Sequence, residues 1–298
     1  MARFIKQVHK KSKAFTLVEL TIVIILVAII AAVSSQFFTN VVLGYNDADL
    51  RVALSHSGRI ATEKVSRELR NAMPQSIRVS NNCIEFIPIS SSAHYQDQNL
   101  TYTSPAVASK PLPVSGQNSA DNQLDVFNLN FTAQAGMNYY VVVYPLGPGS
   151  LNADPYITTN PGSLFNYVSQ SFINAPSNSI TRITMDAAYL FTRHSPMRRL
   201  FIVTAPISYC IVANRLQRHT SYGFNSTQAS PPLGTIQRVV DDLQLNDSGN
   251  PIIPFVFTAG TLVRNAVVKL DFRIRKIDQL GNDNWVRLSH EVQIRNVP

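Results

Sequence analysis

The carboxylate of Glu19 is the most unusual chemical group in this sequence, because it lies among nineteen nearly continuous apolar residues, 15–33. A helix of that length rises about 28 Å at ~1.5 Å per residue, which is most of a hydrocarbon layer of about 30 Å. A carboxylate at membrane depth is costly unless it is protonated or paired. Residues 15–23 offer no cation, so Glu19 predicts a function that needs an acid here.

The charges before this segment predict how the chain is oriented. Residues 1–14 contain five basic residues and no acidic one, and such a basic flank stays in the cytoplasm. The rest of the chain is then expected on the opposite, oxidising side. Without residues 1–14 the formal net charge falls from +8 to 8 − 5 = +3. Nucleic acid is therefore not expected as a partner, because no dense Lys/Arg run remains.

Two cysteines, Cys83 and Cys210, follow the apolar segment. In an oxidising compartment we expect such a pair to form a disulfide, and two free buried thiols are the alternative. Closing a loop this long stabilises a fold by up to about 4–5 kcal/mol if the effect comes from the chain entropy of the unfolded state.

One cluster of oxygen-bearing side chains could supply calcium ligands. It consists of Asp241, Asp242, Asn246 and Asp247. The cluster lacks the full EF-hand pattern, and the adjoining Asp-Ser-Gly is a turn signal, so we favour a turn over a metal site. We expect no metal and no cofactor.

Motifs of enzymatic chemistry are absent from the sequence. It contains no phosphate-binding glycine loop, no G-x-S-x-G elbow and no H-E-x-x-H motif. A sugar-stacking surface is a second idea, although tyrosines near strands usually fill a half-buried face. The tyrosines concerned are Tyr139, Tyr140, Tyr144, Tyr156 and Tyr167.

A long helix is predicted to position Glu19. After the apolar segment, apolar residues recur three, four or seven positions apart with charged residues on the other face. These residues are Leu50, Leu54, Ala61, Val65, Leu69 and Ala72. Pro74 is the stop signal, so the predicted helix covers residues 15–73. Gly44 and Gly58 are expected to soften it locally.

Strands are predicted after the helix. Val79 and residues 83–87 are predicted to form a strand pair joined by a turn at Asn81-Asn82, and residues 90–179 are expected to form strands with long loops. Residues 200–203 and 207–212 are predicted to pair as a hairpin through Ala205-Pro206. The individual strands are predicted at Val79, 83–87, 126–131, 139–144, 180–185, 200–203 and 207–212.

The clearest sheet signal lies near the C-terminus. Apolar and polar residues alternate over 268–275 and again over 286–294, and turn residues 281–284 separate the two runs. The pattern predicts an antiparallel hairpin with one buried and one wet face. One long helix packed through its polar half on an antiparallel sheet is an α+β fold.

The basic leader, Ala14 and the stretch Phe15-Thr16-Leu17-Val18-Glu19 resemble the class III signal of type IV prepilins and minor pseudopilins. The resemblance implies the pilin fold. It also implies that a membrane peptidase cuts between Ala14 and Phe15, methylates Phe15, and leaves the helix on the subunit. For Glu19 it implies pairing with the N-terminal ammonium of a neighbouring subunit. The residue before the cut is usually Gly in this family, so the methyl group of Ala14 is expected to slow cleavage.

Three further stretches, 60–72, 206–210 and 292–296, are similar to the MshO-type minor pilin of the mannose-sensitive haemagglutinin (MSHA) pilus. The similarity implies a cytoplasmic leader, 1–14, a transmembrane and assembly helix, 15–73, and a periplasmic head, 74–298, without enzymatic activity. The implied partners are prepilin peptidase, major and other minor pilins, and the inner-membrane assembly platform. The implied location is the inner membrane and then the pilus.

Several alternatives remain from the sequence. A J-type minor pseudopilin of type II secretion is similar in the helix and in the C-terminal hairpin. A pilus tip adhesin and a signal-anchored periplasmic enzyme are alternatives from other functional classes. An ordinary signal peptide cut after Ser34 is disfavoured, because its apolar core would have to tolerate Glu19.

Overall fold

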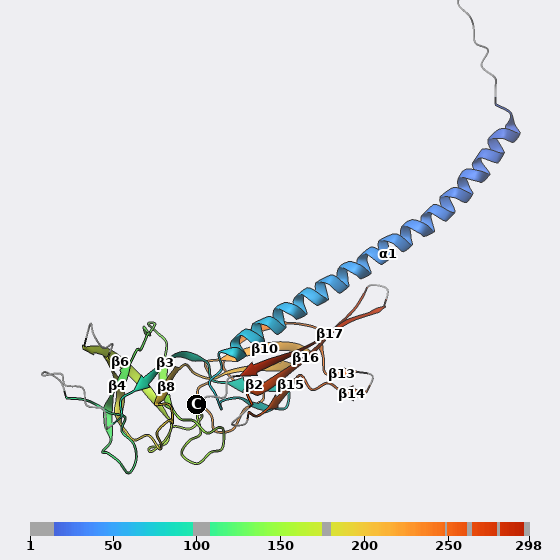
Figure 1. The fold of residues 1–298 in the computed structure, drawn as a ribbon. Coiled ribbons are helices and arrows are strands. Elements are labelled where there is room, and N and C mark those ends of the chain that lie inside the picture. Colours follow the sequence, from blue (N-terminus) through green and yellow to red (C-terminus); the bar gives the residue numbers. More distant parts are fainter. Residues whose placement is uncertain are drawn as a thin grey trace, which may run out of the picture. The chain divides into compact units, whose positions relative to one another are not determined.

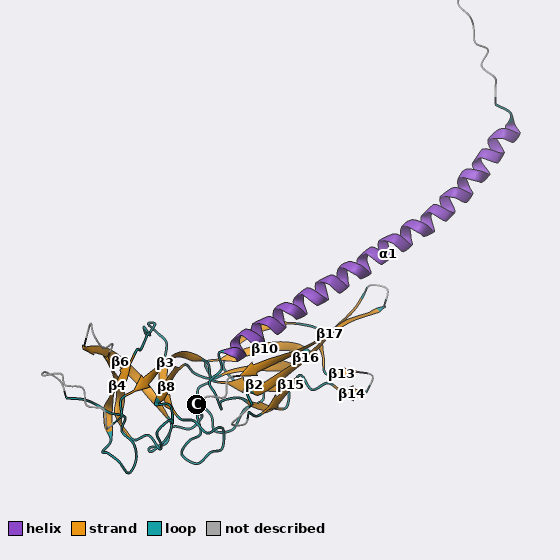
Figure 2. Cartoon of the chain, viewed as in Figure 1, coloured by secondary structure: helices purple, strands orange, loops and turns teal. Residues whose placement is uncertain are grey.

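The computed structural model describes residues 15–97, 108–174, 180–247, 249–260, 264–278 and 281–294. Within them it contains one long helix and a strand-rich head (Figures 1 and 2). The chain divides into two compact units, residues 1–52 and 53–298. Helix α1, Leu17–Arg70, begins in the first unit and ends in the second. The helix and its antiparallel sheets confirm the predicted α+β, pilin-like fold.

Helix α1 ends three residues before the predicted end at residue 73. Its last turn tightens, since the backbone N–H groups of Asn71 and Ala72 donate to carbonyls three residues earlier, at 3.1 and 3.0 Å. Met73 leaves the helix because its N–H donates to the carbonyl of Ile87 at 2.7 Å. Pro74 disfavours a helical conformation at the residue before it, which explains the early end.

Five strands form one antiparallel sheet in the order β1-β2-β9-β10-β11. Asn81 turns the chain between the first two strands with φ 51°, as the Asn81-Asn82 signal predicted. The strands are β1, Arg78–Ser80, β2, Cys83–Phe86, β9, Ile207–Val212, β10, Arg215–Thr220, and β11, Thr235–Val240.

A second sheet is centred on β16, Ala266–Ile277, which pairs with β17, Asp283–Ile294, along one edge. Val268 lies opposite Val292, so the predicted C-terminal hairpin is confirmed. The other edge of β16 pairs with β12, Leu243–Gln244, and β15, Phe255–Thr258, and a separate short pair consists of β13, Asn246–Asp247, and β14, Asn250–Pro251.

The predicted wet face of this hairpin is wrong for the middle of β16. Asp271 and Arg273 are both buried. Arg287 Nη2 pairs with Asp271 Oδ2 at 2.8 Å, while Arg273 pairs with Asp247 and stacks its guanidinium 4.5 Å from the ring centre of Trp285. Charged residues are tolerated there because each has a partner of opposite charge.

Six strands close into a barrel in the order β3-β4-β7-β6-β5-β8. Its interior is filled by fully buried apolar side chains that include Leu124, Val141, Ile183 and Ile202. The sequence predicted strands in this region but not their closure. The strands are β3, Ile89–Tyr95, β4, Asp121–Phe127, β5, Tyr139–Val143, β6, Leu164–Asn174, β7, Ile180–Tyr189, and β8, Arg199–Val203.

The predicted hairpin of residues 200–203 and 207–212 is wrong. Strand β8 pairs with β3 and β5 in the barrel, whereas β9 pairs with β2 and β10 in the five-stranded sheet. Residues 204–206 carry the chain from one sheet to the other. Nearly every side chain of both strands is buried, so their apolar pattern identifies strands but not the partners of those strands.

The part of α1 within the second unit packs one face on the head. Its buried residues recur three or four positions apart, as expected for a helix face, and are Leu54, Gly58, Ala61, Thr62, Val65, Ser66 and Leu69. A Cβ atom at Gly58 would overlap Leu288 of β17 and lie 2.9 Å from Ile274 Cδ1 of β16. Close packing therefore explains Gly58 better than the expected local softening.

Gly58→Ala is expected to destabilise the head by about 1–3 kcal/mol, because the Cδ1 methyl groups of Leu288 and Ile274 must move to make room for the added Cβ atom. Helix propensity alone would favour alanine by up to about 1 kcal/mol. Gly44→Ala is the matched control, since a Cβ atom there meets nothing within 4 Å. Urea unfolding of the full chain in detergent measures both changes. An unchanged or higher midpoint for Gly58→Ala would contradict the packing argument.

Candidate assembly site

Glu19 is the third residue of α1, and Thr16 immediately precedes the helix. The Glu19 backbone N–H donates to Thr16 Oγ1 at 3.3 Å, which is an N-cap contact. Thr16 and Glu19 therefore have the spacing of a capping box, and the carboxylate lies at the positive end of the helix dipole. The T-x-x-E spacing of Thr16 and Glu19 is the signal in the sequence that indicates this cap.

The Glu19 carboxylate has no ion pair with any residue that the structure describes. Among those residues, α1 is the one helix long and apolar enough to cross a membrane by length and composition. An apolar surface this large predicts contact with lipid or with other helices. Its exposed large side chains include Phe15, Leu17, Ile24, Ile30 and Phe38.

Cys83 and Cys210 form a disulfide between adjacent strands of the five-stranded sheet. Cys83 lies on β2 before the barrel and Cys210 on β9 after it, 127 positions later. All six barrel strands, residues 89–203, lie between the two cysteines in the sequence. The disulfide therefore covalently joins the two strands, β2 and β9, between which the chain forms the barrel.

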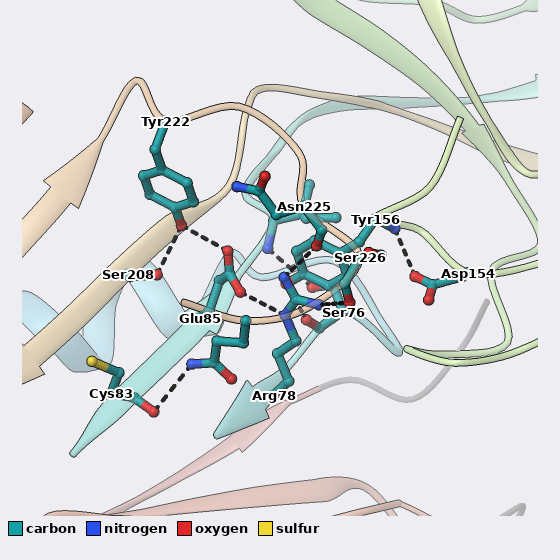
Figure 3. A network of polar contacts seen from close by, with 12 residues as sticks. Ser76, Arg78, Cys83, Glu85, Asp154, Tyr156, Ser208, Tyr222, Asn225 and Ser226 are labelled. Atoms are coloured by element: carbon teal, nitrogen blue, oxygen red, sulfur yellow. Dashed lines mark hydrogen bonds and ion pairs between the residues drawn. The ribbon is translucent and has the colours of Figure 1, made fainter. Parts of the chain in front are cut away.

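A buried ion pair lies beside the disulfide on the same sheet (Figure 3). Arg78 Nε donates to Glu85 Oε2 at 2.5 Å, and the Tyr222 hydroxyl donates to Glu85 Oε1 at 2.9 Å. Glu85 is 2 % exposed. Burial, followed by the nearby Glu85 carboxylate, raises the pKa of Tyr222, so its hydroxyl stays protonated and can donate.

The same arginine connects the sheet to the barrel. Its guanidinium lies 3.6 Å from the ring centre of Tyr156, which belongs to the segment between β5 and β6. The Tyr156 hydroxyl donates to the Ser76 carbonyl at 2.5 Å, and its backbone N–H donates to Asp154 Oδ1 at 2.8 Å (Figure 3). Arg78 therefore helps to fix the barrel on the sheet.

Residues 221–234, the connection between β10 and β11, are named the strap here. Arg78 donates to the strap carbonyls of Asn225 and Ser226 at 2.7 and 2.8 Å. Phe224 packs edge-on against Tyr140 of the barrel, with ring centres 4.6 Å apart. Ser230 Oγ lies 3.1 Å from Cys83 Sγ. The strap therefore contacts the sheet, the disulfide and the barrel.

The predicted calcium candidates are arranged around arginines. Asp241 Oδ1 pairs with Arg215 Nε at 3.1 Å, and Asp247 pairs with Arg273. Asp242 has φ 63°, and its carbonyl accepts from the N–H of Arg275 at 2.9 Å. No metal-binding group of His, Cys, Asp or Glu occurs among the described residues. This arrangement supports the turn interpretation.

The tyrosines proposed for sugar stacking do not form one exposed surface. Tyr139, Tyr156 and Tyr167 are buried. Tyr139 and Tyr167 pack edge-on against Phe131, with ring centres 4.9 and 5.6 Å apart. Three of the five tyrosines therefore fill the head, as the half-buried alternative predicted.

His219 on β10 is a buried titratable group of the five-stranded sheet, with 1 % exposure. Burial lowers its pKa, and the neighbouring Pro232 carbonyl acts in the opposite direction. Because the folded pKa is lowered, protons bind first to the unfolded chain as the pH falls below about 6.5. The associated stability is present above that pH and is lost below it.

As the pH falls below about 6.5, the free energy of unfolding of the wild-type chain is therefore expected to decrease by up to about 1.4 kcal/mol per pH unit through His219. His219→Gln removes the titrating group and should flatten the dependence. Urea midpoints between pH 7.5 and pH 5.5 measure the effect. His56→Gln, which removes an exposed histidine of α1, is the control. Equal slopes for the wild type and His219→Gln would contradict the assignment.

Residues 9–35 match the family model of the prokaryotic N-terminal methylation motif. The matched stretch includes Phe15 and Thr16, which precede α1, and Glu19 in its first turn. It supports a type IV pilin-like protein. Neither a curated protein nor a solved structure matches the chain.

Proteins with this motif are structural pilin subunits rather than enzymes, are processed by prepilin peptidase and interact with other pilins. The apolar helix and the motif together fit a single-pass inner-membrane protein. The methylation motif thus agrees with the exposed apolar side chains of α1. Such side chains need lipid or neighbouring helices around them.

Proposed function

We propose that the chain is a minor pilin of an MSHA-like type IV pilus and acts in pilus assembly or priming. The observation that carries the proposal is Glu19, an acid one turn after Phe15 within the methylation motif and on an exposed apolar helix. Pairing of this carboxylate with a neighbour's N-terminal ammonium offsets the cost of burying it and sets the axial register between helices.

Processing supplies that ammonium. Prepilin peptidase removes residues 1–14, which lie outside the described residues, by cutting between Ala14 and Phe15, and it methylates Phe15. Residues 15–73 then act as the membrane and assembly helix, with the head, 74–298, in the periplasm. The remaining partners are major and other minor pilins and the inner-membrane assembly platform.

Three stretches support the MSHA-like assignment. Residues 60–72 include part of the packed face of α1, and residues 206–210 enter β9 and include the disulfide residue Cys210. The third stretch, 292–296, begins in β17, and its last two residues lie outside the described part. A J-type minor pseudopilin is the second candidate, favoured by the hairpin of β16 and β17. A requirement for pilus formation rather than for protein secretion would separate the two candidates.

The mature protein is expected to begin with N-methylated Phe15. Mass spectrometry of the full chain purified from membranes measures this directly. Ala14→Gly is a matched variant, and it should increase the processed fraction because it removes the methyl group beside the scissile bond. A mature N-terminus at Ser35, or retention of residues 1–14, would contradict the proposed processing.

A further inference from the structure

A groove of about 410 Å³ runs beside the last turns of α1, between the helix and β17. A second groove of about 1020 Å³ lies between the end of the helix, barrel strands β3 and β8, and β17. Arg70 lines both grooves. They therefore adjoin, and the pair is named the helix-side groove here.

The helix-side groove is lined by arginines without acidic partners. Arg59 and Arg70 on α1 and Arg199 on β8 form no ion pair with any residue that the structure describes. The lining arginines are Arg59, Arg67, Arg70 and Arg199, against the acids Glu63 and Glu291, so the formal balance is 4 − 2 = +2. Arg67 differs because it pairs with Glu63 at 3.1 Å.

The spacing of the unpaired groups suits a helical partner. Arg59 and Arg70 are eleven positions apart, which is close to three full turns, so they lie on one face of α1 about 16 Å apart along its axis. Apolar side chains accompany them, with Leu288 in the first groove and Phe201 and Ile89 in the second. An amphipathic helix with carboxylates beside its apolar face would complement this groove. Its carboxylates would meet the arginines, and its apolar face would meet the apolar side chains.

We propose that the helix-side groove receives an acidic amphipathic helix of a different pilin subunit, whose carboxylates pair with Arg59, Arg70 and Arg199. The inference rests on the proposed function, in which the chain packs against other pilin subunits. Guanidinium–carboxylate pairs also give directional contacts that fix partner and register.

A second copy of this chain fits the groove less well. The part of α1 after the apolar segment, residues 34–70, carries five basic and four acidic residues, so its formal charge is 5 − 4 = +1. A helix with this charge does not complement the cationic groove. The acidic partner helix is therefore expected from a different subunit.

Lysine substitution combined with carbodiimide coupling tests the proposal. Arg59→Lys, Arg70→Lys and Arg199→Lys keep the positive charge and place an amine where a contacting carboxylate can be joined to it. Full-length variants are treated in intact cells that contain the natural partners, and mass spectrometry identifies the joined peptides. Arg193→Lys is the matched control, since Arg193 is exposed, has no ion pair among the described residues and lines neither groove.

The expected result is coupling of the groove lysines to Asp or Glu of one other pilin subunit, severalfold above coupling from Arg193→Lys. Coupling only to this chain's own Glu63 or Glu291, to a second copy, or to no carboxylate would overturn the inference; the last outcome includes occupation by lipid phosphate. The same cells report on the proposed function independently. Variants that are cut before Phe15 and enter pili without groove coupling reject the groove partner but not the pilin role.

Discussion

Glu19→Ala is expected to leave cleavage and membrane insertion intact and to reduce incorporation into the pilus or its priming complex at least about tenfold. Breaking a buried ion pair by removing one partner costs about 3–5 kcal/mol, and ~1.4 kcal/mol is a factor of ten in an equilibrium. Within α1 the carboxylate has no ion pair among the described residues. The proposed stabilising partner is therefore the N-terminal ammonium of a neighbouring subunit.

The amount of protein in sheared pili relative to membranes measures this effect, and co-purification of other minor pilins measures it at the priming step. Thr21→Ala is a matched control, because the Thr21 hydroxyl donates to the Val18 carbonyl of its own helix at 2.9 Å. Mass spectrometry of the N-terminus verifies that processing is unaffected. Normal piliation together with normal co-purification in the Glu19→Ala strain would show that this carboxylate does not act in assembly.

Glu85→Ala is expected to destabilise the head by about 3–5 kcal/mol, because it leaves the Arg78 guanidinium buried without a carboxylate. The two carbonyls of the strap that Arg78 also contacts carry no net charge and cannot replace it. The Tyr222 hydroxyl would lose an acceptor as well. Urea unfolding of the full chain in detergent gives the free-energy difference.

Two further variants test whether the loss of stability in Glu85→Ala comes from the buried ion pair and not from the loss of any carboxylate. Glu63→Ala removes an exposed i,i+4 pair with Arg67 and should cost no more than about 0.5 kcal/mol. Replacing both Arg78 and Glu85 by leucine should cost less than the sum of the single changes, because neither charge is then left alone. A Glu85→Ala effect as small as that of Glu63→Ala would show that the buried pair does not hold the strap and barrel on the sheet.

Local patterns in the sequence predicted the parts of this fold that depend on neighbours in the chain. The apolar segment from Phe15 and the stop signal Pro74 placed the ends of α1 to within three residues. Strict alternation and a turn placed the hairpin of β16 and β17. The number of cysteines and their predicted compartment indicated the pair Cys83 and Cys210, and Phe15 to Glu19 identified the methylation motif.

The tertiary structure alone decided the contacts between residues far apart in the chain. Strands β8 and β9 follow each other in sequence but belong to different sheets, because each is buried and can pair with any compatible neighbour. The sequence likewise does not predict that Gly58 packs against Leu288, or that Arg78 and Tyr222 both bond to Glu85. The spacing of apolar residues indicates only which face of a helix or strand is buried. Close packing and charge pairing depend on which surfaces the folded chain brings together.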